Sequence, residues 1–136
     1  MNTEKLEKQL KVIATQADKT QFIYDLLLAY QQPKASVTRL QKGDYNLAKT
    51  AGDILWKQKL FFRASDQDDL HEQIDQLQND RAITDKHPRF IVLTDFQMLL
   101  AVDTKTADTL DIALTDLHKH YDFFLPWAGM EKTQYQ

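Results

Sequence analysis

The run Arg89-Phe-Ile-Val-Leu-Thr94 decides the fold of this chain. Four of its residues are apolar in succession, and a short unbroken apolar run of this kind is typical of a strand that is buried on both faces of a sheet. Before it, residues 66–77 carry Leu70, Ile74 and Leu77 at helical spacing. A buried strand that follows a helix predicts at least one parallel crossover in the sheet.

Further elements extend from this strand in both directions. Residues 98–102 and 109–112 predict two more strands, and they flank a polar turn at 103–108. Upstream, residues 53–56 and 59–64 are short apolar or alternating runs, which predict a ribbon of two strands. Helical spacing is found over residues 3–17, 20–30, 33–40 and 114–121.

This order of elements predicts the fold class. Three N-terminal helices precede two strands, a helix, three strands and a last helix, so we expect an α/β (α+β) domain with one mixed central sheet. The length of 136 residues corresponds to a single domain, residues 1–136. Gly43 follows the third helix, and we expect it to take the left-handed conformation that ends a helix.

The composition excludes several classes of protein. The chain has no Cys, so disulfide frameworks, thiolate zinc sites and cysteine nucleophiles are excluded. With three Gly and three Pro, it has neither a GxGxxG loop nor a P-loop. No apolar run approaches the roughly 18 residues that cross a membrane, and the charged N-terminus is unlike a signal peptide. We therefore expect a cytoplasmic protein that does not contact a membrane.

The charge is distributed unevenly along the chain. Residues 1–65 contain 11 basic and 6 acidic residues, whereas residues 66–136 contain 6 basic and 14 acidic residues. The imbalance is strongest in residues 34–63, with 7 basic and 2 acidic residues. Phosphate groups require clustered cations, so one interpretation of this basic segment is a surface that faces a polyanion. The simpler interpretation is a solvated face of helix and turn.

Six strings spread over the chain resemble a known family. They are similar to the N-terminal domain of MmeI-like DNA methyltransferases, which occur in single-chain type IIL and type IIG restriction–modification systems. The resemblance implies that the chain is the N-terminal accessory domain of a longer, site-specific adenine methyltransferase. The strings are Phe22-Ile-Tyr-Asp-Leu-Leu-Leu-Ala-Tyr30, Pro33-Lys-Ala-Ser-Val-Thr-Arg-Leu40, Gly43-Asp-Tyr-Asn-Leu47, Gly52-Asp-Ile-Leu-Trp-Lys-Gln-Lys-Leu-Phe-Phe62, Pro88-Arg-Phe-Ile-Val-Leu-Thr-Asp-Phe96 and Asp122-Phe-Phe-Leu-Pro-Trp-Ala-Gly-Met-Glu-Lys132.

The resemblance also implies a fold like that of the PD-(D/E)XK restriction endonucleases. In active members, an Asp and a Glu-x-Lys across a hairpin hold Mg²⁺ and orient the attacking water. Here Asp53 stands at the first carboxylate, but Arg63 stands where the Glu is needed and Ser65 where the Lys is needed. A cation at a ligand position repels Mg²⁺, and one Asp is a poor site for an ion that takes several oxygens. We therefore expect a domain without cleavage activity or metal, in which Asp53 and Arg63 pair across two adjacent strands.

A second acidic pattern is formed by Asp95, Asp103 and Lys105, which also fit a loose D…DxK motif. In our prediction Asp103 and Lys105 lie in the turn between two strands. Asp and Thr side chains commonly hydrogen-bond to their own backbone in turns, so we interpret this segment as a turn. An active Mg²⁺ nuclease that uses Asp53, Asp95 or Asp103 is an alternative hypothesis.

Residues 26–47 look like a helix-turn-helix followed by a glycine turn. In such a motif the start of the second helix contacts phosphates or base edges. The alternative is a hairpin of two helices packed on the sheet. A stand-alone helix-turn-helix regulator that binds DNA is therefore a further hypothesis for the function. The candidate DNA-binding residues are Lys34, Ser36, Thr38, Arg39, Lys42 and Lys49.

The tryptophans and histidines fit structural roles better than catalytic ones. We expect Trp56 and Trp127 to be anchors in the core or at an interface. The spacing of the four histidines fits no metal site, so we expect them at the surface or at helix ends. They are His71, His87, His118 and His120.

The chain contains no motif for methyl transfer. Adenine methyltransferases use an Asn/Asp-Pro-Pro-aromatic motif, and the three Pro residues here are isolated from one another. The resemblance therefore implies that S-adenosyl-L-methionine binds to a later part of the same polypeptide, the methyltransferase core. The partners that we expect for this domain are that core and, weakly or indirectly, DNA.

Overall fold

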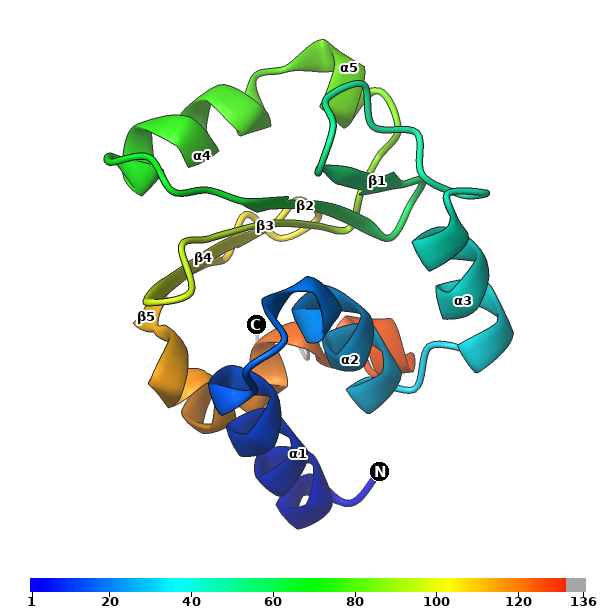
Figure 1. Ribbon diagram of the computed structural model, residues 1–136, viewed down its shortest axis with the longest axis vertical. Coiled ribbons are helices and arrows are strands. Elements are labelled where there is room, and N and C mark those ends of the chain that lie inside the picture. Colours follow the sequence, from blue (N-terminus) through cyan, green and yellow to red (C-terminus); the bar gives the residue numbers. More distant parts are fainter. Residues whose placement is uncertain (132–136) are drawn as a thin grey trace, which may run out of the picture. The chain divides into compact units, whose positions relative to one another are not determined.

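The computed structural model describes residues 1–131, so the predicted domain end at residue 136 lies outside the described residues. Its contacts divide the chain into two compact units. The first unit combines Met1–Thr38 with the chain from Thr115 onward, and the second comprises Arg39–Leu114. The first unit is helical, and the second contains a sheet with helices on one of its faces (Figure 1).

The N-terminal part of the first unit consists of α1 (Thr3–Thr15) and α2 (Phe22–Ala29), joined by the short η1 (Lys19–Gln21). α1 is amphipathic and buries one face, whereas α2 is apolar over most of its surface. Both helices lie where the periodicity predicts them. The buried residues of α1 are Leu6, Leu10 and Ile13.

The C-terminal segment η2 (Leu114–Ala128) differs from the prediction of one short helix over residues 114–121. It is a 3₁₀-helical segment that extends further and is interrupted at His120, where φ is −121°. Aromatic anchors explain its length. The ring of Phe124 is stacked on Trp127 with a centroid distance of 4.8 Å and meets Tyr30 edge-on at 5.9 Å.

Two hydrogen bonds fasten η2 to the end of α2. The hydroxyl of Tyr30 donates to the carbonyl of Tyr121 at 2.7 Å, and Gln32 Nε2 donates to the carbonyl of Trp127 at 2.6 Å. Burial, reinforced by the charge of Asp122, raises the pKa of Tyr30 well above its ordinary value. Trp127 is buried, as expected for a core anchor.

The helix α3 (Lys34–Lys42) begins in the first unit and ends in the second. Gly43 follows it with a φ of +97°, which confirms the left-handed position expected there. The amide of Gly43 donates to the carbonyl of Leu40, and the amide of Asp44 donates to that of Arg39. These bonds satisfy carbonyls that the last turn of a helix leaves open.

The five strands form one sheet, in which the spatial order is the order of the sequence (Figure 1). β2 and β3 are parallel, and the other three neighbouring pairs are antiparallel. This confirms the mixed sheet, the ribbon of two strands and the parallel crossover. The strands are β1 (Ile54–Trp56), β2 (Leu60–Ala64), β3 (Phe90–Thr94), β4 (Met98–Asp103) and β5 (Thr109–Ala113).

The crossover between the parallel strands contains α4 (Leu70–Gln78) and the short α5 (Arg81–Thr84), which the periodicity does not indicate. α4 begins later than predicted, because the side chain of Asp69 caps it by accepting a hydrogen bond from the amide of Glu72 at 3.0 Å. Both helices contribute to the core on one face of the sheet. That core consists of Leu55, Phe61, Leu70, Ile74, Leu77, Ile83, Ile91, Leu93, Leu100 and Val102.

Candidate functional site

The hairpin of β1 and β2 brings Asp53 and Arg63 together. Asp53 directly precedes β1, and the antiparallel register that pairs Ile54 with Phe62 places it opposite Arg63. Arg63 Nε donates to Asp53 Oδ1 at 3.0 Å, and Arg63 Nη2 donates to Asp53 Oδ2 at 2.6 Å. The predicted pairing of these two residues is therefore confirmed, and the pair is bidentate.

The two side chains of the pair differ in exposure. The side chain of Asp53 is 7% exposed and that of Arg63 is 29% exposed. The hydrogen bonds to Asp53 raise the pKa of the Arg63 guanidinium above its ordinary value, although partial burial opposes this shift. The guanidinium also lies 5.6 Å from the ring centroid of Phe61, which belongs to the core beneath α4 and α5.

The groups present at this site do not fit a magnesium ion. Both carboxylate oxygens of Asp53 accept hydrogen bonds from Arg63. Ser65 follows β2, where its amide donates to the carbonyl of Thr94 and its hydroxyl accepts from the amide of Gln67 at 3.2 Å. Mg²⁺ requires oxygen ligands in octahedral geometry, and a guanidinium supplies none. Residues 1–131 contain no group of three or more His, Asp or Glu side chains that could share a metal ion.

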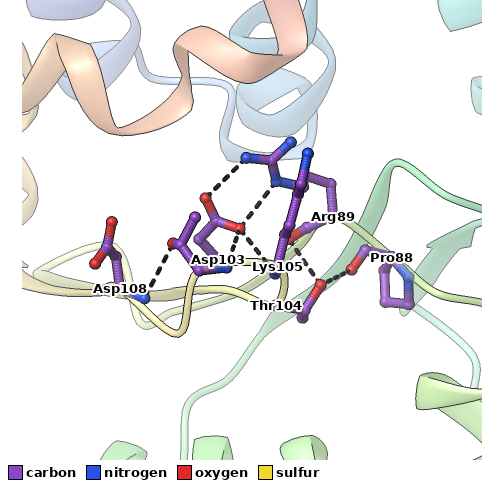
Figure 2. A network of polar contacts seen from close by, with 7 residues as sticks. Pro88, Arg89, Asp103, Thr104, Lys105 and Asp108 are labelled. Atoms are coloured by element: carbon purple, nitrogen blue, oxygen red, sulfur yellow. Dashed lines mark hydrogen bonds and ion pairs between the residues drawn. The ribbon is translucent and has the colours of Figure 1, made fainter. Parts of the chain in front are cut away.

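A second arginine–aspartate pair lies at the opposite end of β3 (Figure 2). Arg89 Nε donates to Asp103 Oδ1 at 2.9 Å, and Arg89 Nη2 donates to Asp103 Oδ2 at 3.2 Å. Asp103 is fully buried, and the side chain of Arg89 is 14% exposed. The register of β3 and β4, which pairs Phe90 with Asp103, positions the two side chains.

The same network closes the turn that follows β4. Asp103 Oδ1 accepts from the amide of Lys105 at 3.0 Å, and the hydroxyl of Thr104 donates to the carbonyl of Pro88 at 2.6 Å (Figure 2). Asp95 likewise accepts from the amide of Met98 at 2.7 Å, and this bond lowers the pKa of Asp95. The interpretation of these residues as turn formers is confirmed, with the refinement that Asp103 is the last residue of β4.

The residues predicted to bind DNA are found in both units. Lys34, Ser36 and Thr38 belong to the first unit, whereas Arg39, Lys42 and Lys49 belong to the second. On α3, the spacing of Lys34, Thr38 and Lys42 places them on one exposed face. Ser36 is only partly exposed, because it lies toward the buried side of the helix. The assignment of these residues to DNA binding stays a prediction.

Sequence reasoning missed an aromatic pair within the basic segment. Tyr45 and Trp56 are stacked, with ring centroids 6.2 Å apart and planes inclined by 3°. Trp56 is partly exposed, so it is not a core anchor, and the alternative role at an interface stays a prediction. One sequence feature points to this pair: both aromatic residues lie close to lysines, with Lys42 before Tyr45 and Lys57 after Trp56.

His71 and His87 are exposed, as predicted, whereas His118 and His120 are partly buried. His71 of α4 contacts Asp111 of β5, with 2.5 Å between His71 Nε2 and Asp111 Oδ2. Their side chains are 70% and 48% exposed, respectively. The hydrogen bond to Asp111 raises the pKa of His71 above 6.5. The Nδ1 atom of His118 is buried and has no hydrogen-bond partner within residues 1–131.

Comparison with known protein families shows the family to which the chain belongs. The model for the family described as "MmeI, N-terminal domain" matches residues 1–136. The chain belongs to this family. The resemblance that the six sequence strings indicate is therefore confirmed over the whole chain.

Among curated proteins, this MmeI N-terminal domain is similar to "DNA methyltransferase A" of Bacillus subtilis (strain 168). The two are 34% identical over 131 residues, which is 96% of this chain and 15% of the relative. The chain thus spans a small part of the relative's length. No solved structure matches the chain. None of the helices in residues 1–131 is long and apolar enough to cross a membrane.

Proposed function

We propose that this chain is the N-terminal accessory domain of a site-specific DNA adenine methyltransferase of a restriction–modification system. Its fold is like that of the restriction endonucleases, and it does not cleave DNA. Membership of the MmeI N-terminal domain family and the similarity to a DNA methyltransferase support the methyltransferase context. The bidentate Asp53–Arg63 pair carries the proposal of lost cleavage, because a cation occupies the place of the second carboxylate.

The cofactor of methyl transfer belongs to the remainder of such an enzyme. S-adenosyl-L-methionine supplies the methyl group, but the residues of this domain do not fit it. Gly43, Gly52 and Gly129 lie in three separate turns, so they form no glycine-rich loop. The role that we propose for this domain is to steady the enzyme on DNA through the basic segment of residues 34–63 or to dock on the methyltransferase core.

Cleavage is tested with the 136-residue chain and supercoiled plasmid, in the presence of Mg²⁺ or Mn²⁺. We expect the plasmid to stay supercoiled, because neither ion has a site at Asp53. The Asp53→Ala variant, purified in the same way, controls for contaminating nucleases. Nicking by the wild type that is absent from this variant would favour the active nuclease and overturn the proposal.

The methyltransferase context is tested in the host cell. We expect an in-frame deletion of residues 1–131 to lower adenine methylation at one recognition sequence, as mapped by single-molecule sequencing of genomic DNA. The Asp53→Ala variant should leave methylation unchanged, since the pair has no catalytic part in it. Unchanged methylation in the deletion strain would contradict the proposal and favour a stand-alone DNA-binding protein.

A further inference from the structure

The basic segment contains an aromatic pair for which lost cleavage and docking give no role. The stacked rings of Tyr45 and Trp56 come from two places in the second unit: Tyr45 from the loop after α3, and Trp56 from the end of β1. Both side chains keep part of their surface in contact with solvent. A stacked, partly exposed aromatic pair is the kind of surface on which a nucleobase can stack.

Hydrogen bonds from Asn46 hold this pair in place. Asn46 Oδ1 accepts from the amides of Leu55 and Ala48, each at 3.0 Å, and Asn46 Nδ2 donates to the carbonyl of Asp53 at 3.0 Å. The amide of Leu47 also donates to the carbonyl of Leu55 at 2.8 Å. The loop therefore runs along the outer edge of β1, and the rings are ordered before any ligand arrives. Such preorganisation lowers the entropic cost of binding.

Cations accompany the aromatic pair. Arg39 Nη1 donates to the hydroxyl of Tyr45 at 3.3 Å, which places a guanidinium at the edge of the rings. Three further cations are Lys42 at the end of α3, Lys49 in the loop and Lys57 directly after Trp56, and all three are exposed. In the described part of the chain, none of these lysines forms an ion pair with a carboxylate.

Acidic side chains do little to offset these charges. Residues 39–63 contain two acidic residues, and one of them, Asp53, forms an ion pair with Arg63. Asp44 is the other. Leu47, which is 45% exposed, adds apolar surface to the loop that carries Tyr45. The segment therefore combines aromatic faces, an apolar side chain and a surplus of positive charge.

We propose that Arg39, Lys42, Tyr45, Lys49, Trp56 and Lys57 form a stacking surface that binds single-stranded DNA. An unpaired base stacks on the aromatic pair, and the cations contact the phosphates on either side of it. Every base has a flat π-face, so such binding tolerates any sequence. In a duplex these faces are covered by neighbouring base pairs, which explains why the surface selects unpaired bases.

The identity of the ligand as DNA rests on the proposed function. An enzyme that modifies a base takes it out of the stack, and unpaired bases are therefore present where a DNA methyltransferase acts. The stacking surface adds a substrate class to the accessory domain: a strand with at least one unpaired base. Neither the Asp53–Arg63 pair nor the docking on the methyltransferase core requires this property.

The test compares a labelled 12-nucleotide oligo-dT with a 12-base-pair duplex in fluorescence anisotropy titrations of the 136-residue chain at low salt. We expect tighter binding of oligo-dT, and about tenfold weaker binding of it by the Trp56→Leu variant, as for the loss of one stacked base. Trp56→Phe keeps an aromatic ring and should keep most of the affinity. In NMR spectra, the indole N–H of Trp56 should shift on titration, whereas that of Trp127 should not.

Equal binding of the duplex and of oligo-dT would overturn the stacking surface. Equal binding of oligo-dT by Trp56→Leu and by the wild type would overturn it as well. If Trp56→Leu fails to fold, Tyr45→Leu takes its place with the same expected loss. The absence of any binding, or a preference for an acidic peptide over oligo-dT, also overturns the inference. The plasmid and methylation experiments test the proposed function separately, because neither expected result requires a preference for unpaired bases.

Discussion

At the scale of single residues, two arginine–aspartate pairs of the same bidentate geometry differ in burial. The carboxylate of Asp53 is 7% exposed beside an arginine that is 29% exposed, whereas Asp103 is fully buried beside an arginine that is 14% exposed. Loss of the arginine leaves an uncompensated charge in each case. The cost of that charge rises with burial, because water solvates an accessible carboxylate but not a buried one.

We therefore expect the two arginines to differ in their effect on stability. Arg63→Met should lower the free energy of unfolding by about 1–3 kcal/mol, as for a buried acceptor that loses its hydrogen-bond partner. Arg89→Met should lower it by about 3–5 kcal/mol, as for a fully buried pair that is broken. Urea unfolding followed by circular dichroism measures both values.

Lys86→Met is the matched control for these two variants. Lys86 is exposed and lies in the same unit, so its replacement should change the free energy of unfolding by less than about 0.5 kcal/mol. Equal losses for Arg63→Met and Arg89→Met would show that burial does not set the cost of breaking these pairs.

The sequence predicts one of these pairs and not the other. Asp53 and Arg63 lie in a hairpin whose two strands are joined by three residues, so their register follows from a few local positions. The register of β3 and β4 depends instead on the turn that Asp95 stabilises, and the apolar pattern of the strands does not specify it. For this reason Asp103 is predicted as a turn residue, but its buried partner Arg89 is not.

At the scale of elements, the loop along the edge of β1 depends on one amide side chain. We expect Asn46→Ala to lower the free energy of unfolding by about 1–3 kcal/mol, since three hydrogen bonds lose a partner. Asn46→Asp should cost less, because a carboxylate still accepts from the amides of Ala48 and Leu55. Urea unfolding of both variants checks this order, and a larger loss for Asn46→Asp would contradict it.

The same amide explains why the aromatic pair escapes prediction. Periodicity reports which residues of an element share a face, but the loop of residues 43–50 has no period. Tyr45 reaches Trp56 because Asn46 makes side-chain hydrogen bonds to β1. Side-chain hydrogen bonds of this kind leave no regular pattern in the sequence. The strands of the sheet are found from the sequence alone, because they consist of alternating or continuous apolar residues.

A pH-dependent contact joins α4 to β5. The contact is the ion pair between His71 and Asp111, and the pKa of His71 is raised in the folded state. The ion pair therefore contributes its full stabilisation below pH 6.5, and this stabilisation is lost as the pH rises through the folded-state pKa of His71. We expect an NMR titration of the His71 ring to give a midpoint above 6.5. Asp111→Asn should move the midpoint back toward 6.5, and an unchanged midpoint in this variant would assign the shift to another group.

At the scale of the whole molecule, the uneven charge predicts where DNA contacts the chain. Residues 34–63 carry a positive net charge, whereas the rest of the chain carries a negative one. Binding of DNA should therefore be weak and strongly dependent on salt. With about three to five phosphate contacts on a duplex, the slope of log affinity against log salt should be about −3 to −5. Fluorescence anisotropy at several salt concentrations measures this slope.

Two charge-reversed variants locate the contact. Replacement of Lys42, Lys49 and Lys57 by Glu should abolish binding, because these exposed lysines supply the positive charge of the proposed stacking surface. Replacement of Lys5, Lys8 and Lys11 on α1 by Glu changes the net charge by the same amount and should weaken binding only slightly. Equal loss in the two variants would mean that net charge, and not the basic segment, controls binding.

The single parallel junction of the sheet has a consequence for the order of folding. β1 and β2 form a local hairpin, and β3, β4 and β5 form a local meander, but the pairing of Leu60 with Phe90 closes a long loop through α4 and α5. Such loop closure is slow compared with the formation of hairpins. We expect the junction between β2 and β3 to form last, and native-state hydrogen exchange to show the β1–β2 hairpin opening as a unit, taking Trp56 and its loop with it while the meander stays protected.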